Sequence, residues 1–214
     1  MRPAGRRWTA RGRRWHRREA GQSVVELSLI LPVFLLLLLG ILEFGMAFDH
    51  LISISYASRE GARAGAALVN GGGALGCGAG QSPNAAGVDA QVIAAVERVL
   101  TSPGSQVALD RVTQIRIYQA SSTGAESGSV NVWTYTPGTG PVVDSSPLDF
   151  TAQSSAWTPC SRVNTLPAPS IGVGIRYRYA FSTPLGGILG FFGGGGQTGL
   201  DVTDRSVMAM NPTQ

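Results

Sequence analysis

The longest apolar run of the chain lies between Val24 and Phe48. From residue 22 to residue 48 the only charged side chains are Glu26 and Glu43. A helix of this length, rising about 1.5 Å per residue, crosses a hydrocarbon core of about 30 Å with some tilt. A core helix of a water-soluble protein would show polar residues at 3.6-residue spacing, and none occurs between Leu29 and Leu39. The pattern predicts a membrane-spanning helix.

The helical pattern continues beyond the predicted membrane segment. Apolar or small residues recur every three or four positions from Leu51 through Ile54 to Ala62, and alanine is frequent. The glycines of residues 71–73 then favour an end to the helix. We therefore expect one helix over residues 22–69. Pro32 lacks the N–H that would bond to the Ser28 carbonyl, so a kink is expected near residues 28–32.

The remaining residues alternate in ways that predict a small α+β domain. One amphipathic helix is expected at residues 88–100, followed by strand-like runs. The clearest alternation places Ile171, Val173, Ile175, Tyr177 and Tyr179 on one face. We expect irregular structure at 136–170 and a glycine-rich hairpin loop at 186–199. The predicted strands are 112–118, 130–135, 171–181 and 200–210. A helix followed by antiparallel strands is an α+β arrangement.

Charge orients the predicted membrane helix. Eight arginines and a single acid, Glu19, precede Gln22. Basic flanks stay on the cytoplasmic side, so we expect a cytoplasmic arm at residues 1–21, without regular structure. The division is then a basic leader (1–21), the membrane helix with its outward extension (22–69) and an extracytoplasmic α+β domain (70–214). Because an adjacent membrane helix accounts for the charge, we expect a lipid bilayer and no nucleic acid as partner.

Few residues of this chain suit catalysis. Lysine is absent, and His16 and His50 are the only histidines. These facts argue against a Walker A phosphate loop, Schiff-base chemistry, a histidine-based triad and a histidine metal site. We predict no catalytic residues, no metal and no cofactor. Cys77 and Cys160 both fall in the part expected outside the cell membrane, where the simplest outcome is one disulfide.

Glu26 is the most unusual residue of the apolar run. An unpaired carboxylate in a membrane helix costs a few kcal/mol and is a functional candidate, although it can also snorkel to the interface. Glu43, near the outer end of the run, is expected at the interface, and a contact with a neighbouring helix is the alternative. The context Gly21-Gln22-Ser-Val-Val-Glu26, after a basic leader, resembles the leader of type IV pilin-like proteins. That resemblance implies cleavage by a prepilin peptidase between Gly21 and Gln22, with glutamate as the fifth residue of the mature chain.

A more specific resemblance covers residues 17–67. Arg18-Glu-Ala-Gly-Gln-Ser-Val-Val-Glu-Leu-Ser-Leu-Ile-Leu-Pro32 with Arg59-Glu-Gly-Ala-Arg63 is similar to the TadE-like family of tight-adherence pilus assembly proteins. The patterns at 173–179 and 204–208 resemble the family's C-terminal region. The family implies minor pilins or pseudopilins that act with other pilin-like subunits, an inner-membrane platform and its secretion ATPase.

The resemblance implies an assembly role for Glu26 and Pro32 and favours a subunit contact for Arg59, Glu60 and Arg63. For the last three, a hydrated helix face near the lipid headgroups is the alternative. We expect a single-pass, structural, non-catalytic membrane protein with its N-terminus in the cytoplasm, acting in a tight-adherence type IV pilus or secretion system. The alternative is an uncleaved anchor that presents an extracytoplasmic adhesin or scaffold domain. A membrane-tethered enzyme is the third possibility, and no nucleophile–base pair supports it.

Overall fold

The computed structural model describes residues 16–68, 85–162, 169–193 and 199–210. The chain divides into two units, Met1–Leu42 and Glu43–Gln214. The first unit contains the start of helix α1 (His16–Ala67), and the remainder of α1 belongs to the second unit. The helix begins at His16, whereas the sequence predicted an irregular arm up to Gly21. Its last residue, Ala67, agrees with the predicted end at residue 69 to within two positions.

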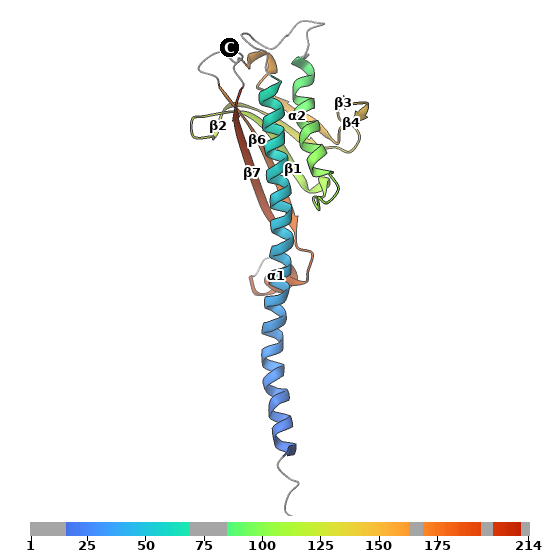
Figure 1. The fold of residues 1–214 in the computed structure, drawn as a ribbon, viewed down its shortest axis with the longest axis vertical. Coiled ribbons are helices and arrows are strands. Elements are labelled where there is room, and N and C mark those ends of the chain that lie inside the picture. Colours follow the sequence, from blue (N-terminus) through green and yellow to red (C-terminus); the bar gives the residue numbers. More distant parts are fainter. Residues whose placement is uncertain (1–15, 69–84, 163–168, 194–198, 211–214) are drawn as a thin grey trace, which may run out of the picture. The chain divides into compact units, whose positions relative to one another are not determined.

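The second unit is built on one antiparallel sheet of five strands in the order β5-β2-β1-β6-β7. Both central pairings are antiparallel; for example, Ile117 of β1 lies opposite Val173 of β6. The α+β class is therefore confirmed, with the long helix, a short helix and an antiparallel sheet (Figure 1). The strands are β1 (Val112–Ala120), β2 (Glu126–Tyr135), β5 (Phe150–Ser155), β6 (Ser170–Ala180) and β7 (Gly199–Ala209).

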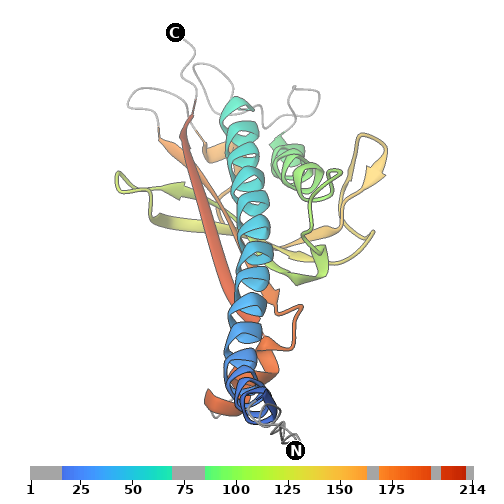
Figure 2. The same ribbon diagram turned by 60° about the horizontal axis from the view of Figure 1, so that its bottom comes forward.

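Two helices cover one face of this sheet. The upper part of α1 and helix α2 (Ala85–Leu100) lie side by side on it (Figure 2). The core joins Ile54 of α1 and Val96 of α2 to Ile115 and Ile175 of the sheet, all of them fully buried. The alternation pattern correctly predicted the buried face of β6. Its five residues are all buried: Ile171, Val173, Ile175, Tyr177 and Tyr179.

The structure corrects two predictions in the second half of the chain. The segment 136–170 is not wholly irregular, because it contains a hairpin of β3 (Val142–Val143) and β4 (Ser146–Pro147), the edge strand β5 and the short 3-10 turn η2 (Pro159–Ser161). A second such turn, η1 (Leu109–Arg111), precedes β1. The predicted glycine-rich loop at 186–199 starts instead as helix α3 (Leu185–Gly193). Its glycine content favoured a loop, but the turn before α3 is fixed by hydrogen bonds to Glu43, which is far away in the chain.

Candidate assembly site on the N-terminal helix

Within the described part of the chain, one helix is long and apolar enough to cross a membrane. It spans Gly21–Ala67, and its most apolar stretch is entirely unburied. Side chains from Val24 to Leu38 are all exposed by more than two fifths of their area where they are large and apolar. An exposed apolar surface of this extent in water is unstable, so it requires lipid or other helices around it.

Glu26 lies on the exposed face of this segment, one helical turn from Gln22. The Gln22 side-chain amide donates a hydrogen bond to the Glu26 carboxylate, with Nε2 and Oε1 at 3.0 Å. Residues four apart on a helix share a face, so this contact is the ordinary i, i+4 arrangement. It matters here because Gln22 is the residue that the leader pattern predicts as the first of the mature chain.

The helix continues through Pro32 without an interruption in its assignment. The Ser28 hydroxyl donates to the Val25 carbonyl, with Oγ and O at 2.7 Å. That bond does not supply a donor to the Ser28 carbonyl, which is the group that Pro32 deprives of an N–H partner. A role for Pro32 in assembly stays a prediction.

The Arg59–Arg63 motif has two different faces. Glu60 and Arg63 form an exposed ion pair at 3.8 Å, with Arg63 exposed by 75% and Glu60 by 47% of their side-chain areas, and Arg59 is exposed as well. Such a pair contributes little to stability by itself. Gly61 and Ala62, in contrast, are buried. A Cβ placed on Gly61 would lie 2.5 Å from Val96 Cγ2, so glycine permits α1 and α2 to approach closely.

Three polar residues outside every motif of the sequence fix α1 to the sheet. Glu43 is 2% exposed and accepts hydrogen bonds from the Tyr179 hydroxyl and from the backbone N–H groups of Ser182 and Thr183. The His50 ring lies 2.9 Å from the Tyr177 hydroxyl through Nδ1.

Ser58, which is fully buried, bonds to the Asp204 carboxylate of β7. The spacing of Glu43, His50 and Ser58 is about two helical turns, so all three lie on the same side of α1. The signal in the sequence was this seven-to-eight-residue repeat of polar positions. The interfacial position expected for Glu43 stays a prediction, and the structure adds that its carboxylate is enclosed by the turn after β6.

The opposite side of α1 carries a row of exposed bulky side chains. Four residues at successive i, i+4 positions are each exposed by more than half, at 59%, 62%, 54% and 61% in chain order. They are Phe44, Phe48, Ile52 and Tyr56. We call this row the outer stripe. It lies in the second unit, beyond Leu42, and nothing in the described residues covers it.

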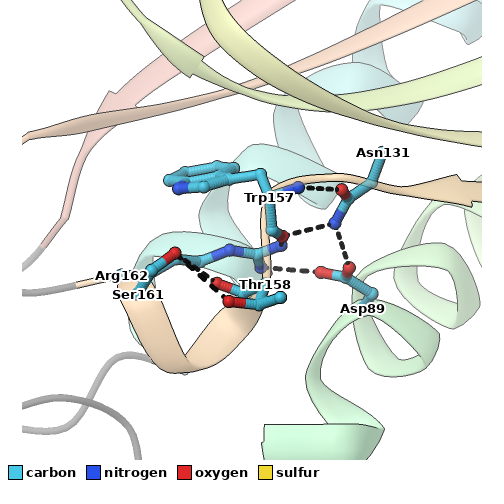
Figure 3. A network of polar contacts seen from close by, with 6 residues as sticks. All are labelled: Asp89, Asn131, Trp157, Thr158, Ser161 and Arg162. Carbon is cyan, nitrogen blue, oxygen red and sulfur yellow. Dashed lines mark hydrogen bonds and ion pairs between the residues drawn. The ribbon is translucent and has the colours of Figure 1, made fainter.

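A buried polar cluster holds the segment 157–162 against α2 and β2 (Figure 3). The Arg162 side chain, fully buried, lies 2.6 Å from Asp89 of α2 through Nη1 and Oδ1, and its guanidinium carbon lies 4.3 Å from the centre of the Trp157 ring. Asn131 of β2 joins the same cluster, accepting from Trp157 N and donating to Asp89 and Trp157 O, each at 2.7 Å. A buried ion pair is retained only with such additional partners.

The cysteine prediction falls partly outside the described residues. Cys160 lies in η2 and packs against Val88, whereas Cys77 is among the residues that the structure does not describe. Their pairing stays a prediction. Among the described residues, no group of three or more histidines, cysteines or carboxylates is positioned to hold a metal ion.

Comparison with known proteins identifies the N-terminal segment. The family model described as TadE-like protein matches residues 21–63, which include Gly21, Gln22, Glu26, Pro32 and the Arg59–Arg63 motif. The resemblance seen in the sequence is thus confirmed, and it indicates a protein associated with the tight-adherence pilus. No curated protein and no solved structure matches the chain. The exposed apolar helix and the family match together indicate a membrane-anchored protein.

Proposed function

We propose that this chain, with its TadE-like segment at residues 21–63, is a minor pilin or assembly component of a tight-adherence pilus, structural and non-catalytic. The observation that carries the proposal is the exposed apolar part of α1, which lies within the matched residues 21–63 and bears Glu26 on its surface. An isolated chain gains nothing from a carboxylate there, whereas a packed array of such helices gains a polar contact that depends on register.

The proposed mechanism begins with processing. Prepilin peptidase cleaves the Gly21–Gln22 bond, removes the arginine-rich leader and creates an α-amine whose pKa is about 8 in model compounds. This amine is mostly cationic at neutral pH and belongs to the residue whose side chain already reaches Glu26. The amine pairs with Glu26 of its own chain or of a neighbouring subunit. Because an unpaired carboxylate is costly in lipid, the pair favours helices that are stacked in the correct register.

In the second unit, the outer stripe offers a further surface for packing. Phe48, Ile52 and Tyr56 offer a ridge of large side chains at i, i+4 spacing, which is the geometry that helices use to pack against one another. Arg59 and Arg63 continue it with positive charge. Other pilin-like subunits are the proposed partners of this face, and the inner-membrane platform with its secretion ATPase would drive their addition.

One observation favours the alternative of an uncleaved single-pass anchor. Helix α1 starts at His16 and passes through the Gly21–Gln22 bond. A peptide bond inside a regular helix is a poor protease substrate until that turn unwinds, because its backbone groups are already hydrogen-bonded. The two functions differ in what becomes of residues 1–21.

The experiment is the identification of the N-terminal residue of the protein recovered from cell membranes, by intact mass and N-terminal sequencing. The proposed function requires a chain that starts at Gln22 in cells with active prepilin peptidase, and a longer chain in cells that lack it. Retention of the leader in both strains would contradict the pilin assignment and support the anchor.

A further inference from the structure

Helix α3 is the part of the second unit whose sequence least suits water. Its nine residues, Leu-Gly-Gly-Ile-Leu-Gly-Phe-Phe-Gly, include no polar side chain. The chain has no charged residue at all between Arg178 and Asp201. In the neighbouring strands β6 and β7, charged side chains occur at several positions. Apolar side chains of such a helix are unfavourable in water unless protein or lipid covers them.

The position of α3 is set by Glu43. The Glu43 carboxylate accepts the N–H groups of Ser182 and Thr183, each at 2.8 Å, and so fixes the turn that precedes α3. The Thr183 hydroxyl then accepts the Leu185 N–H at 3.3 Å, and the Ile188 N–H bonds to the Pro184 carbonyl at 3.1 Å. The first turn of α3 is thus bound to residue 43 of α1 through a continuous set of hydrogen bonds.

Residue 43 follows directly on the apolar run. The uncharged residues 27–42, with Val24 and Val25 before Glu26, account for about 28 Å of helix, close to the hydrocarbon thickness of about 30 Å. Any membrane that contains this run therefore ends within a turn or so of Glu43. Phe44, the next residue, is 59% exposed. The α3 tether consequently lies at the level where hydrocarbon gives way to headgroups.

One side of α3 is occupied by protein. Leu185 is buried, and a Cβ on Gly186 would lie 2.9 Å from the Phe181 ring. Among the α3 residues whose burial is described, the helix is open at Gly187, which is exposed and where a Cβ would meet nothing within 4 Å, and at Ile188, which is only half-buried. Apolar side chains of a surface helix bind at the boundary between lipid headgroups and acyl chains, with a strength that grows with the apolar area they bury.

We propose that α3 is an interfacial helix, which lies in the outer headgroup region of the membrane that α1 crosses and is held there by Glu43. The occupant of its open side is the lipid surface. The inference rests on insertion of the apolar run into the membrane. It does not depend on leader cleavage or on pilus assembly, so this inference and the proposed function can fail separately.

The test places an environment-sensitive fluorophore on Gly187→Cys in the full chain, reconstituted into phosphatidylcholine vesicles under non-reducing conditions. Gly187 is chosen because a side chain there displaces nothing. Some vesicles contain phosphatidylcholine with a nitroxide quencher on the headgroup, and others carry it deep in the acyl chain. Leu35→Cys, within the apolar run, is the inserted control, and Val142→Cys, a 70% exposed apolar residue of β3, is the aqueous control. The parent protein, treated with the same fluorophore, shows how much of the signal comes from labelling of the native cysteines.

We expect the headgroup nitroxide to quench the Gly187 probe several-fold more strongly than the Val142 probe, and the deep nitroxide to quench the Leu35 probe most. Glu43→Ala should reduce the quenching at Gly187 and leave that at Leu35 unchanged. Equal quenching at Gly187 and Val142, with Leu35 inserted, overturns the proposal. So does a Gly187 probe that neither lipid nitroxide nor aqueous iodide reaches, since that result means a protein partner. A Leu35 probe that no lipid nitroxide quenches removes the premise and the proposal together.

Discussion

The Glu43 carboxylate and the Tyr179 hydroxyl, 136 residues apart in the chain, lie 2.5 Å apart with both side chains almost completely buried. Tyr179 donates, and the two backbone N–H groups at 182 and 183 complete the coordination of the carboxylate. This contact joins the long helix to the end of strand β6 and to the turn before α3. It marks the first residue of the second unit.

Glu43→Ala should destabilise the second unit by about 3 kcal/mol. The substitution leaves the buried Tyr179 hydroxyl and the partly buried backbone N–H groups of Ser182 and Thr183 without their acceptor, and each such loss has a cost of its own. Thermal unfolding in detergent measures the effect. Glu60→Ala is the matched control, because Glu60 is on the same helix and is half-exposed, so its change should be within about 0.5 kcal/mol. Equal stability of the two variants would show that the Glu43 contacts do not hold the helix.

Alkaline pH should weaken the same contact. Burial, with the Glu43 carboxylate beside it, raises the pKa of Tyr179 to about 12 from its ordinary value of 10.0. The folded protein therefore holds this proton more tightly than the unfolded chain does. The resulting stability is present below pH 10 and is lost as the pH rises through about 12.

Tyr179→Phe separates this effect from that of the other tyrosines. Burial also raises the pKa values of Tyr118 and Tyr177, so the wild-type curve alone does not assign the loss. We expect the variant to be less stable at neutral pH and to lose less stability than the wild type between pH 10 and pH 12, as measured by denaturant unfolding. Parallel curves over this range would contradict the assignment to Tyr179.

Gly61→Ala should destabilise the contact between α1 and α2 by about 1–3 kcal/mol. The added methyl group lies within 2.5 Å of Val96 and 3.2 Å of Val173, so the helices must separate or side chains must leave their rotamers. Gly45→Ala on the same helix meets nothing within 4 Å and should leave stability unchanged or raise it by up to about 1 kcal/mol through helix propensity. Chemical unfolding of both variants compares them directly.

Arg162→Lys should cost about 3 kcal/mol although it keeps the charge. Lysine cannot both reach Asp89 and donate to the Trp157 carbonyl, which Arg162 Nη2 does at 3.0 Å, and it loses the planar contact with the Trp157 ring. Arg98→Lys, at an exposed pair with Asp144, should change stability by less than about 0.5 kcal/mol. A small effect at Arg162 would mean that the buried cluster orients the segment 157–162 without stabilising the fold.

Glu26→Ala should abolish assembly and leave membrane insertion intact. In the proposed mechanism the carboxylate acts only where helices meet, so removal of its charge should not hinder entry into lipid. The measurements are carbonate-resistant membrane association and the recovery of surface pili or of cross-linked pilin-like complexes. Leu29→Ala, another exposed residue of the apolar run, is the control and should assemble normally. Normal pili in the Glu26 variant would remove Glu26 from the mechanism.

Elements with a strong local signal could be predicted from the sequence. The apolar run, the end of α1, helix α2 and four of the sheet strands follow from periodicity within about ten residues, and so do the buried positions Ile171 to Tyr179. The TadE-like segment was likewise readable, because its motif is continuous along one helix.

Features that depend on distant partners emerged only from the folded chain. Strand β5 is short and mostly polar, and it is a strand because β2 provides its hydrogen bonds. Glycine-rich α3 is a helix next to a turn that Glu43 holds. The burial of Glu43 against the turn after β6 likewise had no signal in the local sequence. In each case local propensity is weak, and the free energy that decides the conformation comes from residues far away in the chain.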